Sequence, residues 1–425
     1  MVGENVKKIY ASLDIGSSSI KLLVGEVINT NVQVLFASSI PSHGVKKGVI
    51  IDEEALKQDI IKLVKEAETS LEAKLTSVLV NIPANQCRLY SITGSTQILS
   101  NDHQIRKEDI AKAINKASKF ERRKNEALVS TIPIKYYYGE QSSYDLPIGK
   151  TAYSLQVDVL AITTTKKALY PYIRVVEGAG LEIMYISVNA YSAAKEVFDE
   201  AYLKDGAVLI DVGHRSTTVS YFEDGFLKYI TVVSVGGYDL TKKIALEWQI
   251  PLSKAETYKI KYGSCNMESN EQDVIHSISE GSHVTHYTKH DLACLLNEGC
   301  NEIMEKVKEK LAVLGEDRKF ETVIIGGGGE IEDFDQVASK SLGRKVRIYR
   351  PQVMGARKLN MVSSLGLIYY LLDRNKIHGD LAPSLLMPEV SSTMTMKLKG
   401  LTKTNTTQIE GKFKKIIDRF VTEEE

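Results

Sequence analysis

One short pattern occurs twice in this chain, about half its length apart, and it limits the folds that the sequence can adopt. The segments IYASLDIGSSSIKLLVG and GAVLIDVGHRSTTVSYF each contain an apolar strand, an Asp-Ile/Val-Gly turn of small polar residues, and a second strand. A further strand, a glycine (Gly48 or Gly237) and an amphipathic helix follow each copy. Such a repeat predicts two related α/β lobes that face one another. The alternative is two unrelated hairpins that share Asp-x-Gly.

Length and charge set the next limits. With 425 residues the chain is too long for one compact core, so we expect at least two domains. Lys plus Arg and Asp plus Glu number 54 each, and this balance argues against nucleic acid as a main partner. The four cysteines form no CxxC pair, which favours reduced, structural thiols in a cytosolic protein. We find neither a signal peptide nor a run of about 20 apolar residues, so any membrane contact is expected at the cytosolic surface.

In the first half, the hydrophobic pattern predicts a main α/β unit interrupted by an insertion. The main unit is expected to contain strands over 9–14, 20–27, 32–38, 78–82 and 182–188 and helices over 52–73 and 166–179. The insertion, residues 84–165, is expected to contain strands over 87–99, 126–138 and 153–162 around one helix over 107–119.

The second half is predicted to be rich in helices between 239 and 315, with a polar loop over 263–287. Thr288 and Asp291 form a capping box at the start of one of these helices. A strand over 322–325 runs into four glycines, and an apolar helix is expected over 365–372. Residues 374–407 are rich in Pro, Ser and Thr without a sustained period, which is typical of a flexible tether.

Both Asp-x-Gly turns have the composition of a phosphate-binding loop. Phosphates need backbone N–H groups at close range, which requires glycine and small side chains in tight turns. An aspartate beside phosphates is repulsive unless a hard cation lies between them, so Asp14 and Asp211 imply Mg²⁺ held mostly through water. Lys21 is expected to add a positive charge. The predicted phosphate contacts are Asp14, Gly16, Ser17, Ser18, Ser19 and Lys21 in the first turn and Asp211, Gly213, His214, Arg215 and Ser216 in the second.

Two further elements are candidates for contact with the nucleoside. Four glycines follow a predicted buried strand and leave a bare backbone on which a purine can lie: Gly326, Gly327, Gly328 and Gly329. The alternative for them is a flexible loop. Glu256 and Lys259 stand at i and i+3 on one helix face, so both can reach one ribose. The alternative for this pair is a solvated surface ion pair.

The C-terminal residues 408–425 have the pattern of a short basic amphipathic helix. Lys412, Lys414, Lys415 and Arg419 supply the basic component. After a tether and without a core to join, such a helix is typical of an interfacial membrane anchor; the alternative is docking on the protein itself or on a partner. The apolar stripe that would enter the membrane consists of Ile409, Phe413, Ile416, Ile417, Phe420 and Val421.

In order and spacing, these elements resemble the superfamily of actin, heat-shock chaperones and sugar kinases. DIGSSSIK at Asp14 and DVGHRSTT at Asp211 resemble its two phosphate loops, and IIGGGGE at Ile324 resembles its adenosine motif. SVNAYSAA at Ser187 and MVSSLGLIYY at Met361 resemble its two connecting helices. Within the superfamily, the segments SHGVKKGVIID, VEGAGLEI, AETYKIKYG and VRIYRPQVMGARK resemble the FtsA family of bacterial cell-division proteins. The insertion also lies where that family carries its distinctive domain.

The resemblance implies an α/β, two-lobed actin-like ATPase fold with an FtsA-type inserted α/β subdomain. The core of the first lobe (IA) is expected in 1–83 and 166–190, and the inserted SHS2-like subdomain (IC) in 84–165. The core of the second lobe (IIA) is expected in 191–238 and 321–373, and the helical subdomain (IIB) in 239–320. The tether (374–407) and the amphipathic helix (408–425) complete the chain.

The resemblance also implies a function. The family binds ATP with Mg²⁺ between the lobes, polymerises into filaments, and tethers FtsZ to the cytoplasmic face of the cell membrane at the septum, where it meets other division proteins. The C-terminal tail of FtsZ is expected to bind IIB, where Lys306, Lys308 and Lys310 are candidate contacts for its acidic residues. Gly299 stands where a basic residue is expected in relatives.

The second turn departs from the glycine-rich pattern of the superfamily. His214 and Arg215 occupy it, and Thr218 stands where relatives often carry a carboxylate. Arg215 is able to bind phosphate, or its bulk loosens the grip of the turn. No residue stands out as a base that activates water, so we name no catalytic residue and expect ATP binding with weak or no ATPase activity.

Two other functions are consistent with the same fold. A PilM-like scaffold for membrane assembly fits the phosphate loops but not a C-terminal amphipathic helix. A small-molecule kinase would need a general-base carboxylate and a substrate pocket, and the sequence shows neither signature.

Overall fold

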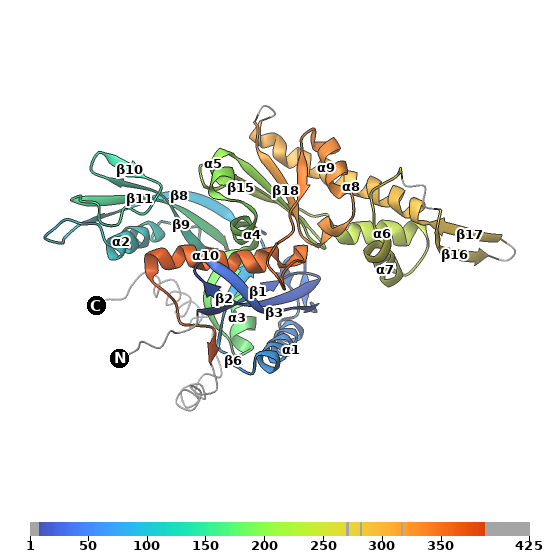
Figure 1. The fold of residues 1–425 in the computed structure, drawn as a ribbon, viewed down its shortest axis with the longest axis horizontal. Helices are drawn as coiled ribbons and strands as arrows, with labels where there is room; N and C mark the ends of the chain where they lie inside the picture. Colours follow the sequence, from blue (N-terminus) through green and yellow to red (C-terminus); the bar gives the residue numbers. More distant parts are fainter. Residues whose placement is uncertain (1–7, 269–271, 281–282, 316–317, 387–425) are drawn as a thin grey trace.

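The computed structural model describes residues 8–268, 272–280, 283–315 and 318–386. Figure 1 shows two sheet-containing lobes in contact, with one smaller unit projecting from each end of the molecule. The unit at one end contains β8–β11 and α2, and the unit at the other end contains α6–α8 and the hairpin β16–β17. Within the described ranges, no helix combines the length and the apolar character that crossing a membrane requires.

A five-stranded sheet forms the centre of each lobe, and the two sheets have the same topology. The strand order is β3-β2-β1-β7-β12 in the first lobe and β15-β14-β13-β18-β19 in the second. In each, three antiparallel strands are followed by two parallel ones. The prediction of two related lobes is therefore confirmed. The bounds are β1 Ile9–Ile15, β2 Ser19–Ile28, β3 Asn31–Pro41, β7 Ser77–Ile82, β12 Glu182–Val188, β13 Ala207–Val212, β14 Thr217–Glu223, β15 Phe226–Val233, β18 Glu321–Ile325 and β19 Val346–Ile348.

Helices cover both faces of these sheets, which explains why the central strands are buried along their whole length. All seven residues of β1 and all six of β7 are buried, as expected for strands packed on both sides. Asp52 caps α1 by accepting a 3.0 Å hydrogen bond from the N–H of Ala55. The helices of the two cores are α1 Glu53–Leu71, α3 Lys166–Gly178, α4 Asn189–Val197, α5 Glu200–Asp205, α9 Phe334–Leu342 and α10 Val362–His378, and the short strands are β4 Val45–Lys46, β5 Val49–Ile50 and β6 Lys74–Leu75.

The inserted residues form an antiparallel sheet covered by one helix; the three predicted strands and the helix are present, and the short strand β10 is a fourth that was not predicted. The strand order is β10-β9-β11-β8, and α2 packs on β8 and β11. A side chain at Gly94 would lie 2.0 Å from the carbonyl of Ala113, so glycine permits this close packing. The first part of β9 belongs to the core of the first lobe and the last part to the core of the insertion. The bounds are β8 Arg88–Gln97, α2 Lys107–Ser118, β9 Glu126–Tyr138, β10 Gln141–Ser143 and β11 Ser154–Thr165.

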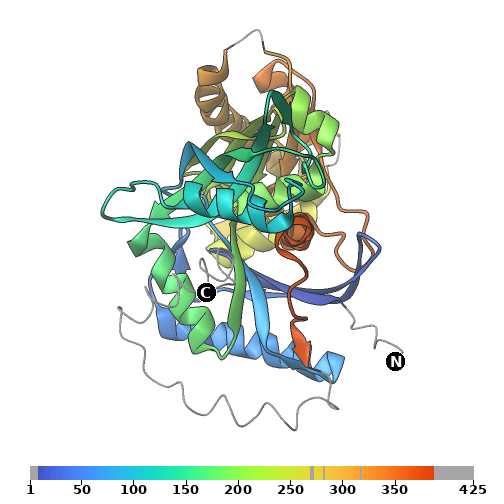
Figure 2. The same cartoon turned by 90° about the vertical axis from the view of Figure 1, so that its left-hand side faces the viewer.

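Two helices, α4 and α10, cross where the lobes meet. A side chain at Gly366 of α10 would lie 2.0 Å from the carbonyl oxygen of Ser192 on α4, so only glycine allows this crossing. The side chain of Asn81 joins both helices to β7: it donates to the carbonyl of Ser363 and accepts from the hydroxyl of Ser192, each at 2.8 Å. Figure 2 shows α10 nearly end-on beside the inserted subdomain.

The helical subdomain differs from the prediction in one segment. Residues 263–287 are not a loop throughout, because β16 and β17 pair as an antiparallel hairpin. Ser, Thr and His alternate with apolar residues there, and the exposed hairpin buries little, so its composition resembles that of a loop. Stacking of Tyr287 on Trp248, with ring centroids 4.8 Å apart, anchors its base. The bounds are α6 Gly237–Glu247, α7 Leu252–Tyr262, β16 Val274–Glu280, β17 His283–Thr288 and α8 Lys289–Leu311.

The tether was predicted to begin at residue 374, and this boundary is wrong. Helix α10 continues to His378, and its residues Arg374 and Asn375 are buried. Residues 379–386 then pack on the first lobe: the N–H of Ser384 donates to the carbonyl of Ile9 at 2.8 Å, and β20 (Leu385–Leu386) pairs with β6. The sequence did not predict this packing, because the residues involved are polar and their partners lie far away in the sequence. The rest of the tether and the amphipathic helix lie outside the described residues.

A half-buried carboxyl group on α4, that of Glu196, provides a test of this packing. The hydroxyl of Tyr349, just after β19, donates a 2.8 Å hydrogen bond to Glu196. Burial raises the pKa of Glu196 to about 7, although the Tyr349 hydroxyl acts in the opposite direction. Since the folded-state pKa lies above the ordinary value of 4.5, the contribution to stability is complete below about pH 4.5 and is lost as the pH rises through about 7.

We therefore expect Glu196→Gln to be more stable than the wild type at pH 8, and to have a smaller advantage at pH 5. The glutamine still accepts from Tyr349 but carries no charge, so the difference in unfolding free energy between variant and wild type should grow by about 1–3 kcal/mol between these pH values. Urea unfolding at both pH values measures this change. Glu140→Gln, in an exposed turn, is the matched control and should show no such trend. An equal pH trend in both variants would contradict the assignment to Glu196.

Candidate nucleotide site

The first Asp-x-Gly turn connects β1 to β2 at the edge of the first lobe. The N–H of Gly16 donates to the carbonyl of Ser19 at 3.0 Å and closes the turn. Asp14 lies opposite Lys21 in the strand register, and the Lys21 Nζ lies 3.0 Å from Asp14 Oδ2. Ser17 Oγ accepts a 3.0 Å hydrogen bond from the N–H of Gly48, which follows β3. The turn therefore holds one aspartate and one lysine side by side.

The second turn connects β13 to β14 and repeats this geometry with a different charge. The N–H of Gly213 donates to the carbonyl of Ser216 at 3.0 Å, as Gly16 does to Ser19. Asp211 lies opposite Thr218, so the position of Lys21 in the first turn is taken by a buried, uncharged side chain. The two turns are alike in backbone, but only in the first is the aspartate paired with a lysine on the neighbouring strand of its hairpin, among the described residues.

The two aspartates influence one another across the lobes. Burial and, to a smaller extent, the negative charge of Asp14 together raise the pKa of Asp211 to about 6, although Lys21 acts in the opposite direction. Carboxylate oxygens are the ligands that Mg²⁺ prefers, and a divalent cation would relieve this repulsion. The donor set therefore fits a magnesium ion held by Asp14 and Asp211.

His214 and Arg215 pack toward α6 at the second turn. The carbonyl of His214 accepts a 2.7 Å hydrogen bond from the N–H of Tyr238. The guanidinium carbon of Arg215 lies 3.8 Å from the ring centroid of Tyr238, which is a close cation–π contact. Gly236 permits this arrangement, because a side chain there would lie 2.4 Å from the carbonyl of Gly213. Arg215 is thus held against α6 in the described conformation.

Glu256 and Lys259 do lie together on α7, but their surroundings differ. Lys259 is buried, and its ammonium group donates to the carbonyl of Gly237 at 2.8 Å, to Thr241 Oγ1 at 2.7 Å and to Glu256 Oε2 at 2.8 Å. These three bonds use all the donors of a lysine, so none is left for a ribose. The Glu256 side chain remains 34% exposed and is the available member of the pair.

The four glycines lie beside the second turn. Gly326 has φ = 87°, and a side chain on it would lie 2.3 Å from Asp211 Oδ1. A side chain on Gly328 would lie 2.4 Å from Val212 Cγ1, whereas one on Gly327 would meet nothing within 4 Å. Gly326 and Gly328 therefore bring the loop against the end of β13, and Gly327 leaves an open backbone surface.

One contact of the site was not predicted from the sequence. The hydroxyl of Ser363, at the start of α10, donates a 3.2 Å hydrogen bond to Asp14 Oδ2. The Ser-Ser pair in MVSSLGLIYY was recognised only as part of a connecting helix, and nothing local indicates that one hydroxyl reaches a residue at the other end of the chain.

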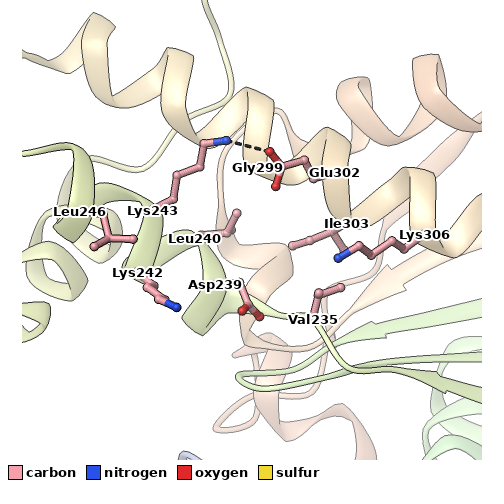
Figure 3. Close-up of a pocket in the computed structure, with 10 residues that line it drawn as sticks. All are labelled: Val235, Asp239, Leu240, Lys242, Lys243, Leu246, Gly299, Glu302, Ile303 and Lys306. Atoms are coloured by element: carbon pink, nitrogen blue, oxygen red, sulfur yellow. Dashed lines mark hydrogen bonds and ion pairs between the residues drawn. The ribbon is translucent and has the colours of Figure 1, made fainter.

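A second candidate site lies on the helical subdomain, between α6 and α8 (Figure 3). It is a cavity of about 280 Å³ with an apolar wall and a charged rim. Lys243 bridges the two helices by pairing with Glu302 at 2.8 Å and Glu298 at 3.1 Å. Glycine at 299 opens the wall, because a side chain there would lie 2.5 Å from Leu240 Cδ2. The lining residues are Val235, Asp239, Leu240, Lys242, Lys243, Leu246, Gly299, Glu302, Ile303 and Lys306.

Of the three lysines predicted on α8, Lys306 lines this cavity, together with Lys242 and Lys243 of α6. Lys308 and Lys310 are not among its lining residues. The two α6 lysines were not singled out in the sequence, because the approach of α6 to α8 is a tertiary contact.

The difference between two neighbouring glycines makes the loop geometry testable. We expect Gly326→Ala to destabilise the protein by about 2–4 kcal/mol, from the positive φ and the overlap with Asp211. Gly327→Ala is the matched control, and it should change the unfolding free energy by no more than about 0.5 kcal/mol. Urea unfolding measures both. Equal effects would show that the loop does not pack as described.

Solved structures with a similar fold define the class of protein. A PilM–PilN type IV pilus biogenesis complex matches 84% of this chain and 97% of its own, with a TM-score of 0.57 at 18% identity. MreB5 of Spiroplasma citri bound to ADP matches 87% of this chain and 98% of its own, with a TM-score of 0.53 at 14% identity. The fold is therefore the actin-like ATPase fold, as the duplicated sheets indicate.

Sequence comparisons identify the family within this class. A model of "Cell division protein FtsA" matches residues 208–366, and a model of the "SHS2 domain inserted in FTSA" matches residues 85–163. The chain is 27% identical over 378 residues to the cell division protein FtsA of Bacillus subtilis, which covers 88% of this chain and 86% of that protein. FtsA of Enterococcus faecalis is 25% identical and covers 87% of this chain and 85% of its own. The chain belongs to the FtsA family of cell-division proteins.

Proposed function

We propose that this protein binds ATP with Mg²⁺ between its lobes and links FtsZ filaments to the cytoplasmic face of the cell membrane at the septum. The observation that carries the proposal is the pair of Asp-x-Gly turns, each closed by a glycine N–H on a serine carbonyl in sheets of one topology. In this view nucleotide controls lobe closure and assembly of the protein into filaments.

Different residues of the site would contact different parts of a bound nucleotide. The small residues of both turns would present backbone N–H groups to the phosphates, and Lys21 would add a charge-assisted contact. Asp14 and Asp211 would hold Mg²⁺ mostly through water, and the ion would neutralise phosphate charge beside the carboxylates. Gly327 offers bare backbone for a purine, and Glu256 offers a carboxylate for the ribose hydroxyls. MreB5 of Spiroplasma citri, which shares the fold, was solved with ADP.

Lys21 provides the test of nucleotide binding. We expect Lys21→Met to weaken binding of Mg-ATP by about 10- to 100-fold, because it removes the lysine that pairs with Asp14 and would contact the phosphates. Titration with a fluorescent ATP analogue measures the affinity, and removal of Mg²⁺ with EDTA should weaken binding by the wild type in the same assay. Lys62→Met, on the exposed face of α1, should bind like the wild type. If Lys21→Met also binds like the wild type, the site is assigned wrongly.

The cavity on the helical subdomain supports binding of the FtsZ tail. Leu240, Leu246 and Ile303 give it apolar walls, and Lys242 and Lys306 give it positive charge from two different helices (Figure 3). An acidic peptide with apolar anchors would match both features. Other division proteins and further copies of this chain are the remaining partners that we propose.

Attachment to the membrane is proposed for the amphipathic segment 408–425. The described chain ends against the first lobe, where β20 pairs with β6, so residues 387–407 connect the segment to this lobe. Four basic residues near the apolar stripe each contribute about 1 kcal/mol at an anionic surface. This is enough for reversible binding that filament formation would strengthen through multivalency.

Co-sedimentation with anionic phospholipid vesicles, FtsZ and Mg-ATP tests the adaptor function as a whole. We expect the full chain to pellet with vesicles and to bring FtsZ with it, whereas a chain ending at Thr407 should do neither. Lys242→Glu combined with Lys306→Glu should pellet with vesicles but leave at least about tenfold more FtsZ in solution. A full chain that stays in solution would favour a PilM-like scaffold, and release of ADP with a phosphorylated metabolite would favour a small-molecule kinase.

A further inference from the structure

Arg374 is a buried cation at the junction of three elements. It lies on α10, and its guanidinium Nη1 donates a 2.6 Å hydrogen bond to the carbonyl of Thr131 on β9. Its Nε lies 3.4 Å from the hydroxyl of Tyr185 on β12, and the ring of Tyr185 lies beneath the guanidinium carbon at 5.2 Å. The side chain thus connects α10 to β12 of the first-lobe sheet and to β9, the strand that runs from the first-lobe core into the core of the inserted subdomain.

Stability alone does not explain a cation at this position. Arg374 is 6% exposed, and its described hydrogen bonds are to a carbonyl and a hydroxyl rather than to a carboxylate. Burial of a charge without an opposite charge is unfavourable, and an apolar side chain of similar length would fill the same space. The fork of the guanidinium does provide directional donors to two elements at once. Arg374 is therefore suited to fix one element relative to another.

Arg374 is part of one stripe of α10 that faces the inserted subdomain. Tyr370, Arg374 and Ile377 are spaced at i, i+4 and i+7, which places them on one face of the helix. The hydroxyl of Tyr370 lies 2.5 Å from the hydroxyl of Ser130, the neighbour of Thr131 on β9. Ile377 belongs to the hydrophobic core of the inserted subdomain. Through this stripe, the second half of α10 contacts β9 and the core of the inserted subdomain.

The first half of the same helix is attached to the candidate cation site. Ser363 donates its hydroxyl to Asp14 Oδ2 at 3.2 Å, and its carbonyl accepts from the side chain of Asn81. From Ser363 to Arg374 a helix extends about 16 Å. Most residues of α10 over this length are buried, so a shift at one end of the helix is expected to move the other.

The strand that Arg374 holds has a point at which it is able to bend. Residues 127, 129 and 132 of β9 belong to the core of the first lobe, and Tyr136 and Tyr138 belong to the core of the insertion. Between these two parts lies Pro133, where the pairing with β11 shifts register. Proline removes a ladder hydrogen bond, and such irregularities bend a strand. Arg374 binds the carbonyl of Thr131, immediately before this point.

We propose that α10 couples the nucleotide site to the orientation of the inserted subdomain, with Arg374 as the positioning residue. The inference rests on the proposed binding of Mg-ATP at Asp14. Cation and phosphate at Asp14 compete with its bond to Ser363, the start of α10 moves, and the stripe transmits this movement to β9. Coupling between two sites is reciprocal, so the orientation of the insertion also sets the affinity for nucleotide.

Hydrogen exchange of the full chain, with and without Mg-ATP, tests this coupling. In the wild type we expect Mg-ATP to slow exchange of amides in α2 and β8 by about fivefold or more, although neither element carries a predicted nucleotide contact. In Arg374→Met this response should be lost. Lys376→Met is the matched control on the same helix, since Lys376 is 61% exposed and pairs only with Asp373. It should respond like the wild type.

Three further results decide between this inference and its alternatives. If the fluorescent ATP analogue does not bind the wild type, the proposed function fails and the inference falls with it. If the analogue binds but exchange in α2 and β8 is unchanged, nucleotide binding stands and the coupling is wrong. An unaltered response in Arg374→Met would also overturn the role of Arg374. Should Arg374→Met fail to fold, Tyr370→Phe removes the neighbouring bond to Ser130 and is expected to weaken the same response.

Discussion

The close crossing of α4 and α10 is the constraint on which the rest of the structure depends. Gly366 lets α10 approach the carbonyl of Ser192, and Asn81 joins both helices to the sheet of the first lobe. Because most residues of α10 are buried, the helix fixes the positions of the units that pack on it. These units include Asp14 at one end of the helix and the inserted subdomain at the other. Packing at interior density leaves little room for them to move independently.

The candidate site combines a symmetric backbone with an asymmetric charge. Both turns are closed by the same glycine-to-serine hydrogen bond, which follows from the duplicated sheet topology. Lys21 pairs with Asp14, whereas the residue opposite Asp211 is the uncharged Thr218, and Arg215 of the same hairpin packs on Tyr238 instead. Burial and the proximity of Asp14 then raise the pKa of Asp211 to about 6. A cation between the lobes would reduce this electrostatic cost, so in the proposed function ion binding would favour a close approach of the two lobes.

Much of the fold was predictable because its signals are local. The strands of both lobes, the capping box at Thr288, the inserted α/β unit and the paired turns all appeared in the sequence as periodicity or as turn residues. The hairpin β16–β17 was missed because exposed strands made of Ser, Thr and His have the composition of a loop. The start of the tether was placed too early because Arg374 and Ser384 are polar, and their partners are hundreds of residues away. Lys259 was expected to contact the ribose, but its ammonium group donates to Gly237 and Thr241 instead. The spacing of residues along α7 does not indicate these bonds, because both partners lie on α6.

The sequence by itself determined the elements and the chemistry of the turns. Strand periodicity, capping residues and glycine depend on neighbours within a few positions, and so does the choice of Asp, Ser and Lys beside a phosphate. Only the tertiary structure decided which of these groups remain available. In the folded protein Arg215 packs on Tyr238, the ammonium group of Lys259 donates to residues of α6, and Ser363 donates to Asp14. These outcomes depend on how α6, α7 and α10 pack, and packing is set by the shapes of side chains that lie far apart in the chain.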